Sequence, residues 1–125
     1  MILDTNAVSG FANGGQTIRE RIRDADGPFL PVIVLGEYRF GLLSSREEEK
    51  RLAWLAELLR YWKVLEITKE TAAHYAEIRQ RLKQNATPIP SNDTWIAALA
   101  RQFQFPILSN DPHFDLVPGI ERVSF

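Results

Sequence analysis

Short apolar runs alternate with longer amphipathic stretches along the whole chain. The short runs are bounded by turn-forming residues and predict β-strands at residues 1–3, 29–30, 63–67, 105–108 and 120–124. Between them, apolar side chains recur at helical spacing and predict helices at residues 7–12, 17–26, 32–43, 46–62, 68–84 and 91–100. Strands that alternate with helices are typical of an α/β domain with a mainly parallel sheet and right-handed connections.

Composition and charge narrow the function classes. The 125 residues, 45% of them hydrophobic, suit a single domain over residues 1–125 with no linker or internal repeat. A net charge of -1 excludes a broad basic surface, so any nucleic-acid contact must be local. The absence of cysteine removes disulfides, thiolate nucleophiles and cysteine-based zinc sites. No stretch reads as a signal peptide or a membrane span, and we expect a cytoplasmic protein.

Two of the predicted strands are followed by carboxylates. Asp4 comes directly after the first strand, and Asp111 comes shortly after the strand at 105–108, behind Ser109 and Asn110. In a parallel sheet, ligands bind outside the carboxyl ends of the strands, at the point where the strand order reverses. If these two strands are neighbours, their acids converge there. A simple N-cap of the following helix would also explain Asp4 taken alone.

Two further acids lie on helices. Glu37 belongs to a helix that follows a strand and therefore begins at the correct end of the sheet, where its side chain faces either solvent or a polar site. Asp93 begins the helix that leads into the strand at 105–108, and chain order suggests the opposite end. A long preceding loop could still bring Asp93 across, so the sequence alone leaves its position open.

Converging carboxylates repel one another, which raises their pKa values or requires a cation. Because the chain has no cysteine and only two histidines, an oxygen-rich site favours Mg²⁺ or Mn²⁺ over zinc. Such a site activates water and stabilises the charge on a phosphoryl group.

Four motifs in chain order resemble those of the PIN-domain ribonucleases, and most closely the VapC toxins of toxin–antitoxin pairs. The motifs are MILDTN at 1–6, GEYRFG at 36–41, PIPSNDTWIAA at 88–98 and ILSNDPHF at 107–114. The resemblance extends from end to end and implies a three-layer α/β/α sandwich. It implies that Asp4, Glu37, Asp93 and Asp111 surround Mg²⁺ or Mn²⁺, with Asp93 brought into the cleft.

The same resemblance implies roles and partners. Asp4 and Asp93 would be the principal metal ligands, Glu37 and Asp111 would bind a second ion or hold waters, and the polar residues Thr5, Asn6 and Ser109 would support the acids. His113 stands where many relatives carry another acid, and we interpret it as a turn or packing residue. The implied activity is hydrolysis of structured RNA, a tRNA or ribosomal RNA, by a homodimer that a cognate VapB-type antitoxin inhibits.

Two surface features remain to be placed. Arg79, Arg81 and Lys83 gather at the end of the helix at 68–84, where they either complement the helix dipole or form a small phosphate-binding patch. An apolar stripe between Leu52 and Trp62 is wide enough to pack on the domain and still meet a partner. We expect the antitoxin to lie along this helix and the one at 32–43.

Other functions fit less well. A phospho-receiver domain would need a lysine at a late strand end, and none is present there. A haloacid-dehalogenase-type phosphatase would need a second Asp where Asn6 stands. The alternative that survives is a catalytically inactive PIN-like module that binds RNA or protein, although the presence of all four acids argues against it.

Overall fold

The structure is a computed structural model that describes residues 1–125. The fold has five strands and six α-helices, with two α-helices between successive strands up to the fourth, and a short 3₁₀ helix, η1 (Pro112–Leu116), precedes the last strand. The strands are β1 (Ile2–Leu3), β2 (Phe29–Pro31), β3 (Lys63–Leu65), β4 (Ile107–Leu108) and β5 (Arg122–Val123). The helices are α1 (Thr5–Ala12), α2 (Gln16–Asp24), α3 (Val32–Leu42), α4 (Glu48–Leu58), α5 (Lys69–Gln84) and α6 (Ser91–Phe103).

The sheet is entirely parallel, with the strand order β3-β2-β1-β4-β5. The chain builds outward from β1 through β2 to β3 and then returns to place β4 on the other side of β1. The reversal of strand order therefore falls between β1 and β4, which pair with Leu3 opposite Leu108. This confirms the adjacency on which convergence of the strand-end acids depends.

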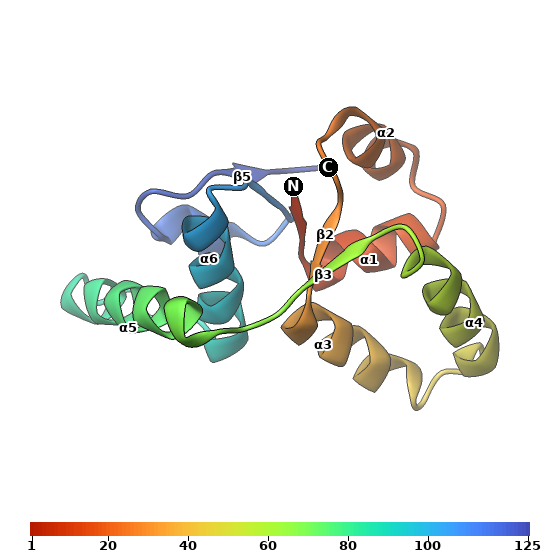
Figure 1. The fold of residues 1–125 in the computed structure, drawn as a ribbon, viewed down its shortest axis with the longest axis horizontal. Helices are drawn as coiled ribbons and strands as arrows, with labels where there is room; N and C mark the ends of the chain where they lie inside the picture. Colours follow the sequence, from red (N-terminus) through yellow and green to blue (C-terminus); the bar gives the residue numbers. More distant parts are fainter.

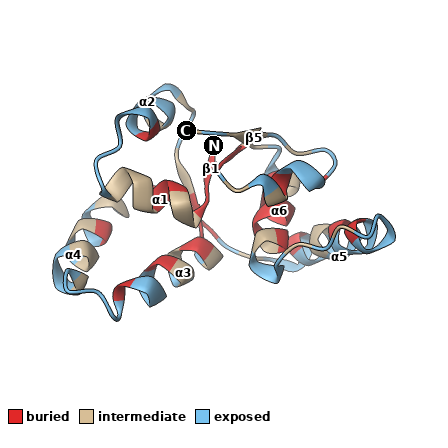
Figure 2. Ribbon diagram, turned by 180° about the vertical axis from the view of Figure 1, so that it is seen from behind, coloured by how far each residue is buried: buried red, intermediate tan, exposed pale blue.

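Helices cover both faces of the sheet, which is the three-layer α/β/α sandwich that the resemblance to PIN domains implies. In Figure 1, α1, α3 and α4 lie on one side of the strands, and α5 and α6 lie on the other. The side chains of Ile2, Leu3, Ile107 and Leu108 are fully buried, and α6 is buried along Ile96–Ala100. Figure 2 shows this buried centre. Because the central strands are rigidly packed, the residues that follow them are held in fixed positions.

Several element boundaries differ from the prediction. The helix expected from Arg46 begins at Glu48, because the Ser45 hydroxyl accepts a hydrogen bond from the Glu47 backbone and forms a turn instead. The helix predicted at 91–100 begins at Ser91, with Pro90 as its N-cap, and continues to Phe103. These shifts of a few residues are the usual uncertainty at helix ends.

The apolar stripe of α4 and the turn after it packs inward. Leu55 and Trp62 are buried, and the other apolar side chains of the stripe are half-buried against the core. Phe11 of α1 contacts both Trp54 and Trp62, with ring centroids 6.0 and 5.2 Å apart. No helix combines the length and the hydropathy needed to cross a bilayer.

Candidate functional site

Asp4 and Ser109 are the first residues after the paired strands β1 and β4, and they meet side by side. The Ser109 hydroxyl donates to Asp4 Oδ2 at 2.6 Å, and both residues are buried. Asp4 is also the N-cap of α1, since its Oδ1 accepts from the Thr5 backbone N–H at 2.7 Å. Asp4 is therefore both a helix cap and a carboxylate at the switch point.

Ser109 connects the two strand ends. Besides donating to Asp4, its hydroxyl oxygen accepts from Asn6 Nδ2 at 3.2 Å and from the Asp111 backbone N–H at 2.9 Å. Asn6 Nδ2 also donates to Asp4 Oδ2 at 3.1 Å. This network uses the full capacity of a buried hydroxyl and fixes the turns after both strands relative to each other.

Glu37 lies in the middle of α3, which follows β2 at the same edge of the sheet. Its Oε1 accepts from the Thr5 hydroxyl at 3.2 Å, and the side chain is half-buried. The solvent-facing interpretation of this acid is therefore wrong, because Glu37 points toward the end of β1.

Asp93 lies in the first turn of α6, with its side chain 14% exposed. Its Oδ2 is 2.9 Å from Nδ1 of His113, beside Asp111. The position suggested by chain order was wrong. A helix that leads directly into a parallel strand runs antiparallel to it, so its N-terminus lies at the strand's carboxyl edge.

Asp111 is the N-cap of η1, where its Oδ1 accepts from the His113 backbone N–H at 2.9 Å. The His113 ring turns back, placing Nδ1 3.1 Å from Asp111 Oδ1. His113 is thus more than a turn residue, because its imidazole lies between two acids. Its spacing of two residues from Asp111 in a proline-led turn was the available signal.

An open cleft of about 630 Å³ collects these side chains. All four predicted acids line it, together with Thr5 and Asn6, while Ser109 lies buried beneath. Five further residues line the cleft that the sequence did not predict. Ser9 and Gly10 belong to α1, Asn13 follows this helix, Asn110 follows β4, and Phe125 ends the chain. Phe125 is the only hydrophobic residue among them, so the cleft suits a polar ligand.

Burial and mutual repulsion govern the electrostatics. Burial raises the pKa of Asp4, the Asp111 charge raises it further, and bonds from Ser109, Thr5 and Asn6 oppose the shift. Burial likewise raises the pKa of Asp93, with the His113 bond opposing and the Asp4 and Asp111 charges adding to it. The bond to Asp93 in turn raises the pKa of His113. The cleft thus holds carboxylates that lack sufficient positive charge.

The donor set fits a hard divalent cation. Asp93, Asp111 and His113 each offer a ligand atom, and these atoms lie within 4.8 Å of one another. Asp4 and Glu37 supply carboxylate oxygens to the same cleft. Oxygen-rich sites of this kind suit Mg²⁺ or Mn²⁺, whose charge would relieve the repulsion.

Comparison with known proteins agrees with the fold and the site. The family model of the PIN domain matches residues 1–120, and the chain therefore belongs to the PIN-domain family. Ribonuclease VapC5 from Mycobacterium tuberculosis is 27% identical over 124 residues, covering 98% of this chain and 90% of that protein.

Solved structures extend the likeness. A chain in DNA-bound VapBC from Salmonella typhimurium is 28% identical with a TM-score of 0.88, covering 98% of this chain and 96% of that one. A chain in VapBC2 from Rickettsia felis, bound to a promoter DNA fragment, has the same TM-score of 0.88 over 98% of this chain and 96% of that chain. At 21% identity, that second likeness speaks for the fold alone.

Proposed function

We propose that this protein is a metal-dependent endoribonuclease toxin that uses Mg²⁺ or Mn²⁺, with residues 1–125 acting as one PIN domain. The observation that carries the proposal is the convergence of four carboxylates from separate elements in one polar cleft. Membership of the PIN-domain family and similarity to a ribonuclease support the same activity. We propose a structured RNA, a tRNA or a ribosomal RNA, as substrate, and the cytoplasm as the location.

Each acid has a role that follows from its place. Asp4 and Asp93 would be the main ligands of the ion, and Glu37 and Asp111 would hold a second ion or its waters. The ion would lower the pKa of a water molecule, so that the water loses a proton and becomes a nucleophile for the phosphodiester near neutral pH, and it would supply positive charge for the developing oxyanion. Thr5, Asn6 and Ser109 keep the carboxylates oriented, through the hydrogen bonds described above.

The second candidate is a PIN-like module that binds RNA or protein without cutting. A module that does not cut RNA would not need Asp4, because burial of this carboxylate, which raises its pKa, costs free energy in the folded protein. Retention of that costly group, together with its three hydrogen-bond donors, favours the enzyme.

Inhibition by a VapB-type antitoxin is proposed from the VapBC complexes among the similar structures. An arginine or lysine from the antitoxin tail would neutralise the acidic cleft. The rest of the antitoxin would lie along α3 and α4, where Phe40 and Leu43 are exposed. We also propose a homodimer. Unchanged antitoxin affinity in the Phe40→Asp and Leu43→Asp variants, which alter exposed side chains, would contradict this position of the antitoxin.

Cleavage of a pool of tRNA and ribosomal RNA tests the activity. We expect discrete cuts by the purified, antitoxin-free protein in Mn²⁺ or Mg²⁺, and no cuts with EDTA or with the Asp93→Asn variant. Intact RNA in a sample shown by circular dichroism to be folded and by calorimetry to be metal-loaded would favour the binding module.

A further inference from the structure

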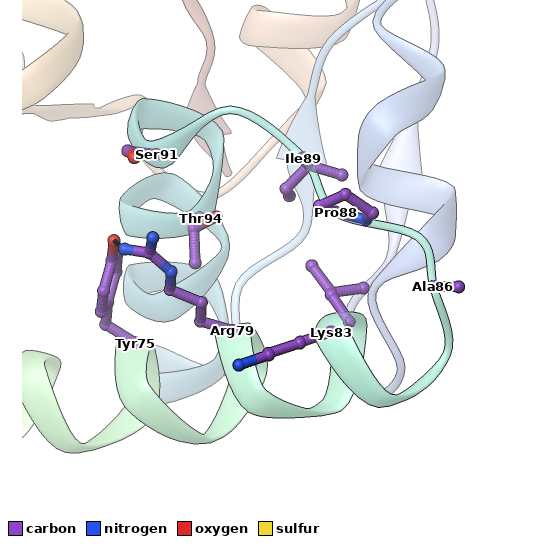
Figure 3. Close-up of a pocket in the computed structure, with 9 residues that line it drawn as sticks. Tyr75, Arg79, Lys83, Ala86, Pro88, Ile89, Ser91 and Thr94 are labelled. Atoms are coloured by element: carbon purple, nitrogen blue, oxygen red, sulfur yellow. Dashed lines mark hydrogen bonds between the residues drawn. The ribbon is translucent and has the colours of Figure 1, made fainter.

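A second cavity lies on the other side of the first turn of α6 from the acidic cleft. It has a volume of about 460 Å³ and is formed by α5, the loop after it and the start of α6 (Figure 3). Tyr75, Arg79 and Lys83 line it from α5, and Pro88 and Ser91 line it from the other side. We call this cavity the basic pocket. No carboxylate lines the cavity, in contrast to the cleft nearby.

Arg79 is held in place by aromatic neighbours. Its Nη1 donates to the Tyr75 hydroxyl at 2.7 Å, and its guanidinium lies 5.8 Å from the centre of the Tyr75 ring. The Tyr75 ring stacks on Trp95 of α6, with ring centroids 4.0 Å apart and planes at 22°. One Arg79 donor is thereby used, and the remaining donors of the guanidinium fork stay available to a ligand.

Lys83 lies one helical turn beyond Arg79 on the same face of α5, and Figure 3 shows its ammonium extending along the helix toward Arg79. None of the seven ion pairs in the protein includes Arg79 or Lys83. Favourable placement at the helix C-terminus explains Arg81 and Lys83, which are in the last turn of α5, but Arg79 lies before that turn.

The opposite wall adds apolar surface and a helix N-terminus. Pro88 and Ile89 line the cavity from the loop, and Leu82 lines it from α5. The N-cap of α6 is Pro90, which offers no side-chain acceptor to the first-turn N–H groups beside Ser91. An apolar wall beside an anchored guanidinium, an ammonium and a positive helix end suits a nucleotide, with its base on the wall and its phosphate on the cations.

The basic pocket lies close enough to the acidic cleft for one RNA strand to contact both. Ser91 and Thr94 line the basic pocket, while Asp93, between them in sequence, lines the acidic cleft. Only the width of one helix, about 10 Å, separates the two sites. An ion in the acidic cleft would attract only the phosphate that is cleaved, and the net charge of -1 provides no general attraction, so a local cationic contact would help to hold the rest of the strand.

We propose that the basic pocket binds one nucleotide of the RNA substrate, next to the phosphodiester that reaches the acidic cleft. Arg79 and Lys83 contact its phosphate, and its base packs against Pro88 and Ile89 of the apolar wall. This inference rests on the proposed function and deepens it, because it assigns a substrate contact outside the cluster of acids.

Cleavage kinetics and direct binding test the pocket together. Relative to wild type, Arg79→Ala combined with Lys83→Ala should raise KM for the cleaved RNA roughly tenfold or more, with the larger part of the loss in KM. Arg81→Ala is the matched control, since Arg81 is on the same helix but does not line the cavity. It should leave KM within about twofold of wild type, because one exposed charge outside the pocket contributes little.

Binding is measured with a single-stranded RNA hexanucleotide in EDTA, where we expect no cleavage, by fluorescence anisotropy and by the emission of the tryptophans. The double variant should weaken binding about tenfold and reduce the salt dependence of log K by roughly 1 or more, the sign of lost phosphate contacts. Trp95→Phe should remove most of the change in tryptophan emission on binding. Trp95 stacks on Tyr75, and Tyr75 lines the pocket and accepts a hydrogen bond from Arg79.

The results separate this inference from the proposed function. Absence of cleavage by wild type, with hexanucleotide binding that depends on Arg79 and Lys83, would overturn the nuclease and retain the pocket. Cleavage with unchanged KM and affinity in the double variant, or an equal loss in Arg81→Ala, would overturn the pocket and retain the nuclease. Unchanged RNA affinity with weaker antitoxin binding or a lost dimer would assign the pocket to a protein partner and overturn the RNA assignment.

Discussion

The chain leaves β1 and β4 through the same three kinds of residue in a different order. After β1 come Asp4, Thr5 and Asn6, whereas after β4 come Ser109, Asn110 and Asp111. The register of the strands places Asp4 beside Ser109 as the first residue out of the sheet, and both are buried. Asp111, two residues further along, has 29% of its side chain exposed at the mouth of the cleft.

This difference shows how position after a strand changes the behaviour of the same carboxylate. Next to the sheet, Asp4 loses water, and burial raises its pKa against the effect of three hydrogen bonds. Further out, Asp111 caps a short helix and keeps contact with solvent. Buried and rigid groups suit tight binding of an ion, while the more exposed acid suits holding a water or a second ion. Four substitutions test this comparison.

The comparison predicts the largest loss for Asp4→Asn. The NH₂ of the new amide would face groups that donate to Asp4 in the wild type, namely Ser109 Oγ, Asn6 Nδ2 and the Thr5 N–H. The ion would also lose the negative charge of a buried ligand. We expect single-turnover RNA cleavage to fall by roughly 10²-fold or more. Asp115→Asn, which removes an exposed acid outside the cleft, is the control and should retain activity. Activity of Asp4→Asn within threefold of wild type would contradict the account.

Ser109→Ala tests whether the end of β4 contributes to the site mainly through the hydroxyl of Ser109. The change leaves Asp4 without a buried donor and the Asp111 N–H without its acceptor. We expect the free energy of unfolding, measured in urea, to fall by about 1–3 kcal/mol. Cleavage should fall about 10–100-fold, because Ser109 orients the acids. Ser44→Ala, at an exposed position, is the control, and equal stability of the two variants would show that the network does not hold the strand ends together.

Asp111→Asn should have a smaller effect than Asp4→Asn. The amide oxygen can still accept from the His113 N–H and cap η1, so the fold should be retained. We expect a loss of cleavage of about tenfold, at the lower end for groups that support a metal site. An Asp111→Asn variant as inactive as Asp4→Asn would reverse our ranking of the two acids and make Asp111 a principal ligand.

The smallest effect concerns stability without metal. Asp93 has a folded-state pKa raised above its ordinary value of 3.8, so the native state binds its proton more tightly than the unfolded chain does. Its contribution to stability therefore falls as the pH rises from about 3.8 through the raised pKa. In EDTA at pH 7, Asp93→Asn should melt at a higher temperature than wild type, and the gain should shrink as the pH is lowered.

Asp115 provides a control of opposite sign for that melting experiment. Its bond with Arg122 lowers the pKa of Asp115, so its contribution is present at neutral pH and lost as the pH falls. Asp115→Asn should therefore melt slightly below wild type at pH 7. A lower melting temperature for Asp93→Asn at pH 7 would mean that its bond to His113 outweighs burial and repulsion.

The sequence predicted the parallel sheet and the convergence of Asp4 with Asp111 because these features depend on local order, whereas the supporting roles of Thr5, Asn6 and Ser109 came from the resemblance to PIN domains. Apolar runs define the strands, and polar residues directly after them must lie at one edge. The resemblance of the motifs to PIN domains supplied what local order did not, namely that Asp93 joins the cleft.

The remaining features depend on contacts between distant segments. The direction of Glu37 is fixed by Thr5 across the gap between α3 and α1, and no pattern within α3 reveals that bond. The His113 ring reaches Asp93 only because η1 folds back over the start of α6. Phe125 lines the cleft because its backbone N–H donates to Asn110 Oδ1 beyond β4. Asp93 lies at the carboxyl edge of β4 because a helix that leads into a parallel strand begins at that edge, the opposite of the expectation from chain order.

The most direct test of the metal site is anomalous diffraction from crystals soaked in Mn²⁺. We predict a peak in the cleft with carboxylate oxygens of Asp4 and Asp93 at about 2.0–2.2 Å, the distance expected for a small octahedral cation. The peak should be absent from crystals of the Asp4→Asn variant. The assignment of these acids would be contradicted if the protein cleaves RNA but its crystals show no anomalous peak in the cleft, or show a peak only at another place.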